Sequence, residues 1–283
     1  MPSFCVTATI DSDKLELAYA TWYSLNMSGC EEINAGSQTQ VKVFFNDLSS
    51  AEHAKSYIKE IQPLTDIKIF EVQEQDWNRK WRESMEPAKL AQGFWVSPLW
   101  LPPPLKDDDI WIKIEPKMAF GTGHHETTRL AAQHIISQKK WLPGKSVLDI
   151  GTGSGVLCFV ADLCGSQKNL GVEIDKDCLI NLAENHEQNP PNGNVNFLIG
   201  TPSALKDTCR FDLIVMNMLM TESEPLLETV SSILAPGGIL IRSGILKDEK
   251  DEAINSTCRF PFRLIDQSTE NEWWCGTFSK SGD

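Results

Sequence analysis

The chain has 283 residues, of which 41% are hydrophobic and 23% charged, and its formal net charge is −13. Domains usually contain roughly 100 to 200 residues, so this length predicts two globular domains, and the composition excludes a disordered chain. The acidic balance and the lack of basic clusters argue against direct nucleic-acid binding and favour a basic partner.

The first 73 residues predict a small α+β domain. Short apolar runs alternate with segments of helical spacing that follow Asp or Ser cap candidates. Strands are expected at 3–9, 29–35, 40–45 and 66–71, and helices at 13–27 and 49–62. This βαββαβ order is typical of a ferredoxin-like sandwich.

Residues 74–108 are interpreted as a connector, because this segment is rich in Trp and Pro. Trp77 and Trp81 are four residues apart and would share one face of a short helix, while the prolines at 102–104 predict an extended turn before a strand at 110–114. Packing between domains is the simpler interpretation of the tryptophans, and contact with a ligand is the alternative.

Residues 109–283 predict a doubly wound, seven-stranded α/β domain of the Rossmann-like kind. From Lys145 onward strands and helices alternate, which indicates a parallel sheet covered on both faces. The expected strands are SVLDI, NLGVEI, VNFLI, FDLIVM and GGILIRSGI, and the expected helices are 154–164, 176–188 and 222–234. The end of the chain, FRLIDQSTE and WWCGTFSK around a polar turn, predicts a closing antiparallel hairpin.

The segment from Val147 to Gly155 reads VLDIGTGSG and joins a predicted strand to a predicted helix. Gly151, Gly153 and Gly155 let the backbone turn sharply and approach a ligand, and the helix N-terminus behind them favours polar ligand groups. A dinucleotide site prefers GxGxxG, whereas the spacing here is GxGxG, which favours a methyl donor. For the glycines alone, a structural turn is the alternative.

Three polar residues in or beside the predicted strands are candidates for the same site. Glu173 ends the next strand, where its carboxylate would accept hydrogen bonds from ribose hydroxyls, with a solvated strand end as the alternative. Asp149 would orient the glycine loop or the amino group of the donor. Asn217 interrupts the apolar run FDLIVMNMLM, and its amide can both donate and accept hydrogen bonds at the site. A local cap or turn is the alternative role for Asn217.

The segment FGTGHHETT at 120–128 precedes the sheet and would fold over a ligand. His125 is the best nominee for a general base, and bracing of the FGTG loop through a hydrogen bond is the alternative. No Cys or further His follows His124 and His125 at ligand spacing, so no metal site is expected. Neither GxSxG nor a P-loop occurs, which excludes the hydrolase and phosphoryl-transfer sites built on those motifs.

The sequence resembles the ribosomal protein methyltransferase family called PrmA, which modifies large-subunit ribosomal protein eleven in bacteria. The motifs extend nearly end to end and are DWNRKW, FWVSPLW, EPKMAFGTGHHETT, VLDIGTGSG, GVEID, MNML, PGG followed by SGIL, and EWWC. The resemblance implies an S-adenosylmethionine-dependent N-methyltransferase that acts on lysine or N-terminal amines of that protein. It also implies that the first domain, 1–73, recognises the substrate and that 109–283 performs the transfer.

The resemblance further implies that Thr128, Gly151, Glu173 and Asn217 contact the methyl donor, with Phe120 to Gly123 nearby. Together with the candidates already named from the motifs, they complete the expected site. The expected cofactor-binding residues are Phe120, Gly121, Thr122, Gly123, Thr128, Asp149, Gly151, Gly153, Glu173 and Asn217. The expected catalytic residues are Asn217 and His125. A ribosomal large-subunit protein is the expected partner.

This chain departs from the family pattern at several positions. The family loop usually reads GTGTHPTT, so His124 and Glu126 replace a threonine and a proline. GTGSG and GVEID replace the usual GCGSG and GIDID. MNML replaces a small residue followed by NIL, which changes the walls near the acceptor. Methylation of another protein or of a small amine is therefore an alternative, and a cofactor-binding scaffold without turnover is another.

The cysteines and apolar segments indicate the expected location. The eight cysteines form no CxxC pair, and the N-terminus lacks the charged and apolar regions of a signal peptide. No apolar run reaches the roughly 18 to 20 residues that span a bilayer. We expect a cytoplasmic monomer with no membrane partner.

Overall fold

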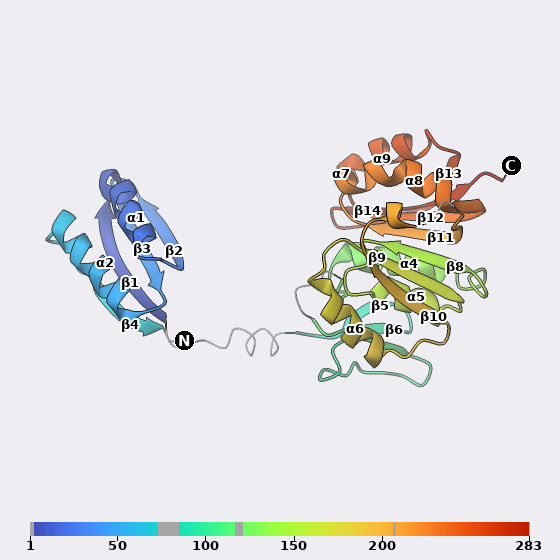
Figure 1. Ribbon diagram of the computed structural model, residues 1–283, viewed down its shortest axis with the longest axis horizontal. Coiled ribbons are helices and arrows are strands. Elements are labelled where there is room, and N and C mark those ends of the chain that lie inside the picture. Colours follow the sequence, from blue (N-terminus) through green and yellow to red (C-terminus); the bar gives the residue numbers. More distant parts are fainter. Residues whose placement is uncertain (1–2, 73–84, 117–120, 206–207, 283) are drawn as a thin grey trace. The chain divides into compact units, whose positions relative to one another are not determined.

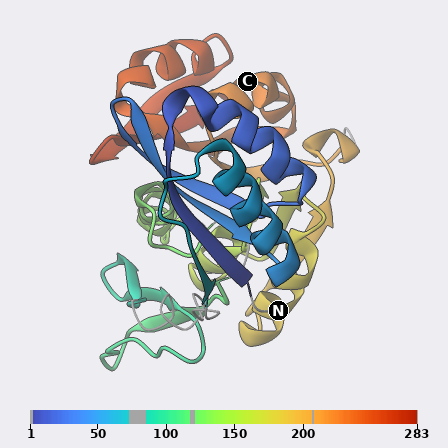
Figure 2. The ribbon, with the colours of Figure 1, turned by 90° about the vertical axis from the view of Figure 1, so that its left-hand side faces the viewer.

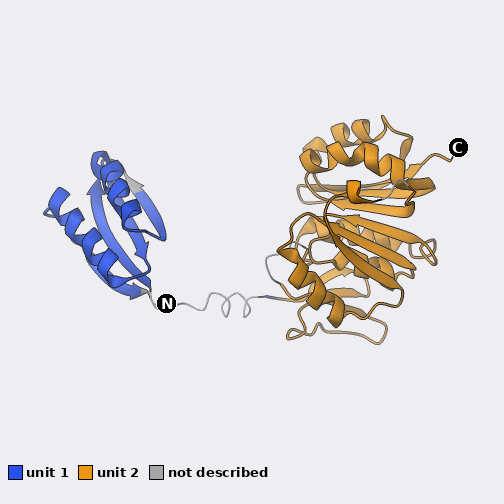
Figure 3. Cartoon of the chain, in the orientation of Figure 1, with its two compact units in different colours: residues 1–85 blue, residues 86–283 orange. Residues whose placement is uncertain are grey.

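The computed structural model describes residues 3–72, 85–116, 121–205 and 208–282. They fall into two compact units, residues 1–85 and residues 86–283, which Figure 3 shows in separate colours. The short helix expected around Trp77 and Trp81 and the candidate Phe120 lie outside the described residues.

Unit 1 is an antiparallel sheet with two helices on one of its faces (Figure 2). Its strands pair in the order β2-β3-β1-β4. In chain order the elements are β1 Ser3–Asp11, α1 Leu15–Ser24, β2 Gly29–Ala35, β3 Gln38–Phe45, α2 Leu48–Ile61 and β4 Lys68–Val72. Alternate residues of β3, including Val41 and Val43, are buried, and the fully buried Trp22 of α1 packs in the same core. The predicted ferredoxin-like βαββαβ order is confirmed.

Unit 2 is built on a seven-stranded sheet with the order β10-β9-β8-β11-β12-β14-β13 (Figure 1). The first five strands of that order are parallel, and β14 and β13 close the sheet as an antiparallel hairpin. The strands are β8 Ser146–Ile150, β9 Lys168–Glu173, β10 Asn194–Ile199, β11 Phe211–Asn217, β12 Leu234–Leu246, β13 Phe262–Glu270 and β14 Trp273–Lys280. The predicted doubly wound sheet with its closing hairpin is confirmed.

Helices cover both faces of this sheet. They are α4 Glu126–Ser137, α5 Val156–Leu163, α6 Cys178–Gln188, α7 Met220–Ser223, α8 Leu227–Ile233 and α9 Lys250–Thr257. One core contains side chains of α4 and α5, and a second contains side chains of α8 and α9. Seven of the eight residues of α5 are buried, which accounts for its sequence VLCFVADL, apolar at every position except Asp162.

The strand order reverses at β8. Its parallel neighbours are β9 on one side and β11 on the other. The chain adds β9 and β10 on the first side and then returns to place β11 on the second. At such a point the connections that follow neighbouring strands run to opposite sides and leave a crevice at the carboxyl ends of the strands. Open α/β sheets bind their ligands in this crevice. The topology therefore places the ligand site after β8.

A small sheet lies at the start of unit 2 and has the order β5-β6-β7. Its strands are β5 Ala88–Ala91, β6 Phe94–Ser97 and β7 Ile110–Lys113. Leu90 and Val96 share a core with Leu130 of α4, and Gln133 of α4 donates a hydrogen bond to the Leu90 carbonyl at 3.0 Å. Two of these strands come from the range interpreted above as a connector, and their contacts lie within unit 2.

A buried arginine of β12 forms hydrogen bonds that hold α7 and α9 against the sheet. Arg242 is fully buried, and its guanidinium donates to Ser223 Oγ of α7 at 2.8 Å and to Thr257 Oγ1 of α9 at 2.7 Å. It also forms an ion pair of 3.2 Å with Glu224, which accepts a hydrogen bond from Ser256. Burial lowers the pKa of Arg242, and the Glu224 carboxylate opposes that shift.

We expect Glu224→Ala to destabilise unit 2 by about 2 to 3 kcal/mol, because it leaves the buried guanidinium without its counter-charge. Urea unfolding followed by circular dichroism measures the change. Glu228→Ala alters an exposed glutamate of α8 and is the control, with an expected change within about 0.5 kcal/mol. Equal stability of the two variants would contradict the anchoring role of Arg242.

Candidate functional site

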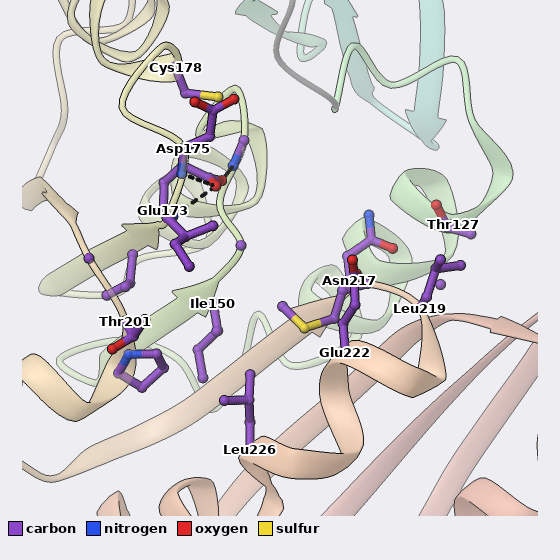
Figure 4. A pocket seen from close by; sticks show the side chains of 18 of the residues that line it. Thr127, Ile150, Glu173, Asp175, Cys178, Thr201, Asn217, Leu219, Glu222 and Leu226 are labelled. Carbon is purple, nitrogen blue, oxygen red and sulfur yellow. Dashed lines mark hydrogen bonds between the residues drawn. The ribbon is translucent and has the colours of Figure 1, made fainter.

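A cavity of about 700 Å³ opens at the carboxyl ends of β8, β9 and β11 (Figure 4). In the figure, Glu173, Asp175 and Thr201 lie together on one side, and Thr127, Asn217, Leu219 and Glu222 lie together on the other. We call these the Glu173 side and the Asn217 side. The cavity is lined by His125, Thr127, Ile150, Gly151, Gly153, Val172, Glu173, Ile174, Asp175, Cys178, Gly200, Thr201, Pro202, Asn217, Met218, Leu219, Glu222, Leu226, Gly244 and Trp273.

The glycine loop after β8 forms the floor between the two sides. Gly151 has a φ of 72°, a left-handed conformation that favours glycine, and a Cβ there would lie 2.9 Å from the methyl group of Met218. Gly151 and Thr152 both donate backbone N–H bonds to the Val172 carbonyl, at 2.8 and 3.1 Å. The loop is therefore turned back tightly on β9, and no side chain stands between its backbone and the cavity at Gly151.

Glu173 holds the loop from the end of β9. One carboxylate oxygen accepts the Gly153 N–H at 2.9 Å, and the other accepts the N–H groups of Ile174 and Asp175 at 2.9 and 3.1 Å. The side chain is 9% exposed and lies in the cavity wall. A carboxylate has about four acceptor positions, so Glu173 retains capacity for a hydroxyl donor from a ligand.

Asn217 ends β11 on the opposite side. Its Nδ2 donates to Thr128 Oγ1 at 3.4 Å. Its Oδ1 is buried and has no hydrogen-bond partner among the described residues. The adjacent Ser243 of β12 donates to the Thr127 carbonyl at 2.9 Å, which joins the start of α4 to the end of the sheet. An unpartnered buried acceptor is costly, and a ligand N–H would satisfy it.

The described part of the FGTG loop contacts the site only through intermediaries. Gly121 accepts a hydrogen bond from Ser154 Oγ at 2.8 Å through its carbonyl, which ties the loop to the glycine turn. Gly123 packs so closely that a Cβ would lie 2.0 Å from the Val96 side chain. Thr122 Oγ1 lies 3.3 Å from Nδ1 of His124.

His125 caps α4 and lines the cavity beside Trp273. Its Nδ1 accepts the Thr127 N–H at 3.3 Å and lies 2.9 Å from the Thr127 hydroxyl. The His125 and Trp273 rings are 5.0 Å apart in an edge-to-face arrangement. The ring thus caps α4 through Thr127. Bracing of the FGTG loop by His125, the alternative to a general base, stays a prediction.

Asp149 is buried beneath the glycine loop. One carboxylate oxygen accepts the Thr152 hydroxyl at 2.7 Å, and the other has no partner among the described residues. Burial raises the pKa of Asp149 to about 7; the Thr152 hydrogen bond opposes this shift and the nearby Glu173 carboxylate adds to it.

The structure brings only part of the predicted set to the cavity surface. His125, Gly151, Gly153, Glu173 and Asn217 line it. Five other predicted residues lie outside the lining: Gly121, Thr122, Gly123, Thr128 and Asp149. Thr128 contacts the lining residue Asn217, and Asp149 contacts Thr152, which stands between the lining residues Gly151 and Gly153. Sequence reasoning missed Thr127, Met218, Leu219, Glu222 and Trp273. The family motif MNML contains Met218 and Leu219, and the motif EWWC contains Trp273, so family resemblance was the signal that could have found these three residues.

These features fit a nucleoside methyl donor. The glycine floor allows close approach of a ligand, Glu173 offers acceptor capacity at one side, and Asn217 Oδ1 offers an unused acceptor at the other. Among the described residues, no group of three or more potential metal-binding side chains is present.

A model of the ribosomal protein L11 methyltransferase family (PrmA) matches residues 5–281. The chain belongs to this family. Family membership confirms the predicted resemblance, and with it the class of S-adenosylmethionine-dependent methyltransferases and S-adenosylmethionine as the cofactor.

Individual relatives agree with the family match. The chain is 31% identical over 246 residues to a protein of Staphylococcus carnosus named ribosomal protein L11 methyltransferase, which covers 83% of this chain and 78% of the relative. It is 34% identical over 208 residues to the protein of that name from Burkholderia lata, covering 73% of this chain and 65% of the relative. The chain thus spans slightly less than two thirds of the Burkholderia protein.

A solved structure confirms the fold. The ribosomal protein L11 methylase of Lactobacillus delbrueckii subsp. bulgaricus superposes with a TM-score of 0.63 and 25% identity. The superposition covers 70% of this chain and all of the other chain.

We expect the stability of the protein to fall as the pH rises from about 4 to about 7, in part because of Asp149. With a pKa of about 7 in the folded state against 3.8 for an unperturbed aspartate, folded Asp149 keeps a proton that the unfolded chain has lost. Asp149→Asn should remove this part of the slope. Urea unfolding between pH 4.5 and 8 measures it, with the exposed Asp108→Asn as the control. Parallel pH profiles of wild type and Asp149→Asn would contradict the assignment.

Proposed function

We propose that this enzyme transfers methyl groups from S-adenosylmethionine to lysine or N-terminal amines of ribosomal protein L11. Its family and its relatives' names support this substrate. The observation that carries the proposal is the Asn217 side chain, which lines a cavity at the point where the strand order reverses. Its buried Oδ1 has no hydrogen-bond partner among the described residues. An acceptor oxygen there suits an N–H donor, which an amine substrate provides.

We assign the Glu173 side to the nucleoside part of the donor. The Glu173 carboxylate would accept hydrogen bonds from the ribose hydroxyls, and the backbone at Gly151 and Gly153 would approach the donor closely. Thr128 would position the Asn217 amide by accepting its hydrogen bond, and Asp149 would position the glycine loop through its hydrogen bond with Thr152. Phe120 and residues 121–123 are proposed to lie near the donor, as the family pattern implies.

The Asn217 side is proposed to receive the acceptor amine. S-adenosylmethionine supplies an electrophilic methyl group bound to a sulfonium sulfur. The amine nitrogen must be neutral to attack it, whereas a free lysine with a pKa of about 10.4 is almost wholly protonated at pH 7. Met218, Leu219 and Leu226 give the cavity an apolar wall, which disfavours the charged amine. Asn217 Oδ1 would then accept an N–H and align the nitrogen lone pair.

The partners follow from charge and domain order. An acidic enzyme, with a net charge of −13, suits a basic acceptor protein. Residues 1–73 are proposed to recognise that protein and 109–283 to perform the transfer. Of the proposed connector 74–108, the part that forms β5 and β6 belongs to unit 2. In the described part of the chain, every helix is too short or too polar to cross a bilayer. A cytoplasmic monomer that does not bind nucleic acid directly is part of the same proposal.

We expect the purified protein to transfer a radiolabelled methyl group from S-adenosylmethionine to purified ribosomal protein L11. Asn217→Ala should lower kcat/KM by about 100-fold, since it removes the acceptor that orients the amine. Asn196→Ala makes the same substitution at an exposed position of β10 and should keep wild-type activity. Full activity of Asn217→Ala would refute its role, and donor binding without transfer to any basic protein would favour the scaffold alternative.

We expect His125→Asn to retain kcat within about threefold, because asparagine is also a good N-cap and the role argued for His125 is capping. His125→Ala should lower the free energy of unfolding by about 1 kcal/mol. Steady-state methylation assays and urea unfolding measure the two effects. A loss of about 100-fold in kcat in both variants would instead identify the imidazole as a base.

A further inference from the structure

Glu222 is an acidic side chain on the Asn217 side of the cavity that the proposal above leaves without a role. It belongs to α7, directly after β11, and it lines the cavity while remaining exposed. Figure 4 shows it near Asn217 and Leu219, on the side away from Glu173. A carboxylate in this position contributes negative charge to the region where the acceptor amine is proposed to bind.

The three carboxylates that line the cavity differ in what they contact. Glu173 accepts three backbone N–H bonds, and Asp175 Oδ1 accepts the Asp177 N–H at 2.9 Å. Within the described parts of the chain, no hydrogen bond or ion pair involves the Glu222 carboxylate. Among the described residues that line the cavity there is no Lys or Arg. Among the described residues that line the cavity, Glu222 is thus the carboxylate with no hydrogen bond or ion pair to the protein, and it can bind a cationic ligand.

The backbone at Glu222 is held in place by contacts of the neighbouring residues with the buried Arg242. The next residue, Ser223, is fully buried and accepts a hydrogen bond from Arg242, and the following Glu224 forms the ion pair with the same guanidinium. Glu222 N–H also donates to the Leu219 carbonyl at 3.1 Å. A charge on a fixed backbone loses less entropy on binding a ligand than one on a mobile loop.

We propose that Glu222 determines acceptor specificity by binding the protonated amine of the substrate at the exposed edge of the cavity. This inference rests on the proposed function, and it narrows the acceptor class to cationic amines. The ammonium contacts Glu222 first. It then leaves the carboxylate and loses its proton to water as it approaches the apolar wall, where burial disfavours the charged form, and the neutral nitrogen reaches Asn217. Glu222 therefore acts in capture of the acceptor rather than in methyl transfer, and its removal affects KM rather than kcat.

The first test compares Glu222→Gln with Glu228→Gln, an exposed glutamate of α8 outside the cavity lining whose substitution makes the same change in net charge. We expect Glu222→Gln to raise KM for ribosomal protein L11 by about three- to tenfold, with kcat within twofold of wild type. The Kd for S-adenosylmethionine, measured by calorimetry, should not change. Glu228→Gln should match wild type throughout. Equal KM values for the two variants, or a weakened donor Kd in Glu222→Gln alone, would overturn the inference.

A second test does not depend on L11 as the substrate. Calorimetry compares binding of a lysine-containing peptide and its norleucine counterpart to the full chain with S-adenosylhomocysteine present. Wild type should prefer lysine by about three- to tenfold, and Glu222→Gln should lose that preference. If wild type fails to methylate L11 yet keeps this preference, the proposed substrate is wrong and the role of Glu222 stands. No preference for lysine in wild type would overturn the role of Glu222.

Discussion

The site depends first on the Glu173 carboxylate, which binds three backbone N–H groups at the junction of β9 and the glycine loop. A loop made of glycines has little intrinsic preference for one conformation, so its shape must be imposed by contacts. Glu173 imposes it from the side, and Asp149 with Thr152 imposes it from beneath. The same carboxylate faces the cavity, so the residue that shapes the loop is also the one proposed to bind the donor ribose.

The Asn217 side is assembled differently, from segments that are far apart in the sequence. Ser243 of β12 bonds to Thr127, and Asn217 of β11 bonds to Thr128, so the start of α4 is fixed against two strand ends. Trp273 reaches the same cavity from the closing hairpin. The acceptor side therefore forms only when unit 2 has folded completely, whereas the glycine loop and Glu173 come from one β-α-β segment.

This difference explains which parts of the site could be predicted from the sequence. Gly151, Glu173 and Asn217 were predictable because each follows a buried apolar strand, and the ends of parallel strands meet at one edge of the sheet. The strands at Ala88–Ala91 and Phe94–Ser97 were not predicted, because they are four residues each and lie among Trp and Pro. Glu222 gave no local signal of a site, and Trp273 gave none beyond its place in the motif EWWC, because only tertiary contacts bring the hairpin and α7 to the cavity.

Two of the departures from the family pattern, HHETT and MNML, have different physical consequences. Glu126, which stands in place of a proline, accepts a hydrogen bond from Asn271 at 2.9 Å, and Arg129 Nε one turn later donates to Glu270 at 3.0 Å. The hydrogen bond from the Glu126 backbone N–H, and after it the one from Asn271, lower the pKa of Glu126, so the carboxylate holds the loop against the hairpin turn. The HHETT change is thus accommodated by contacts outside the cavity. In MNML, by contrast, Met218 and Leu219 themselves line the cavity, next to the segment that carries Glu222. A change of acceptor preference in this chain would therefore arise from the residues after β11 rather than from the loop before α4.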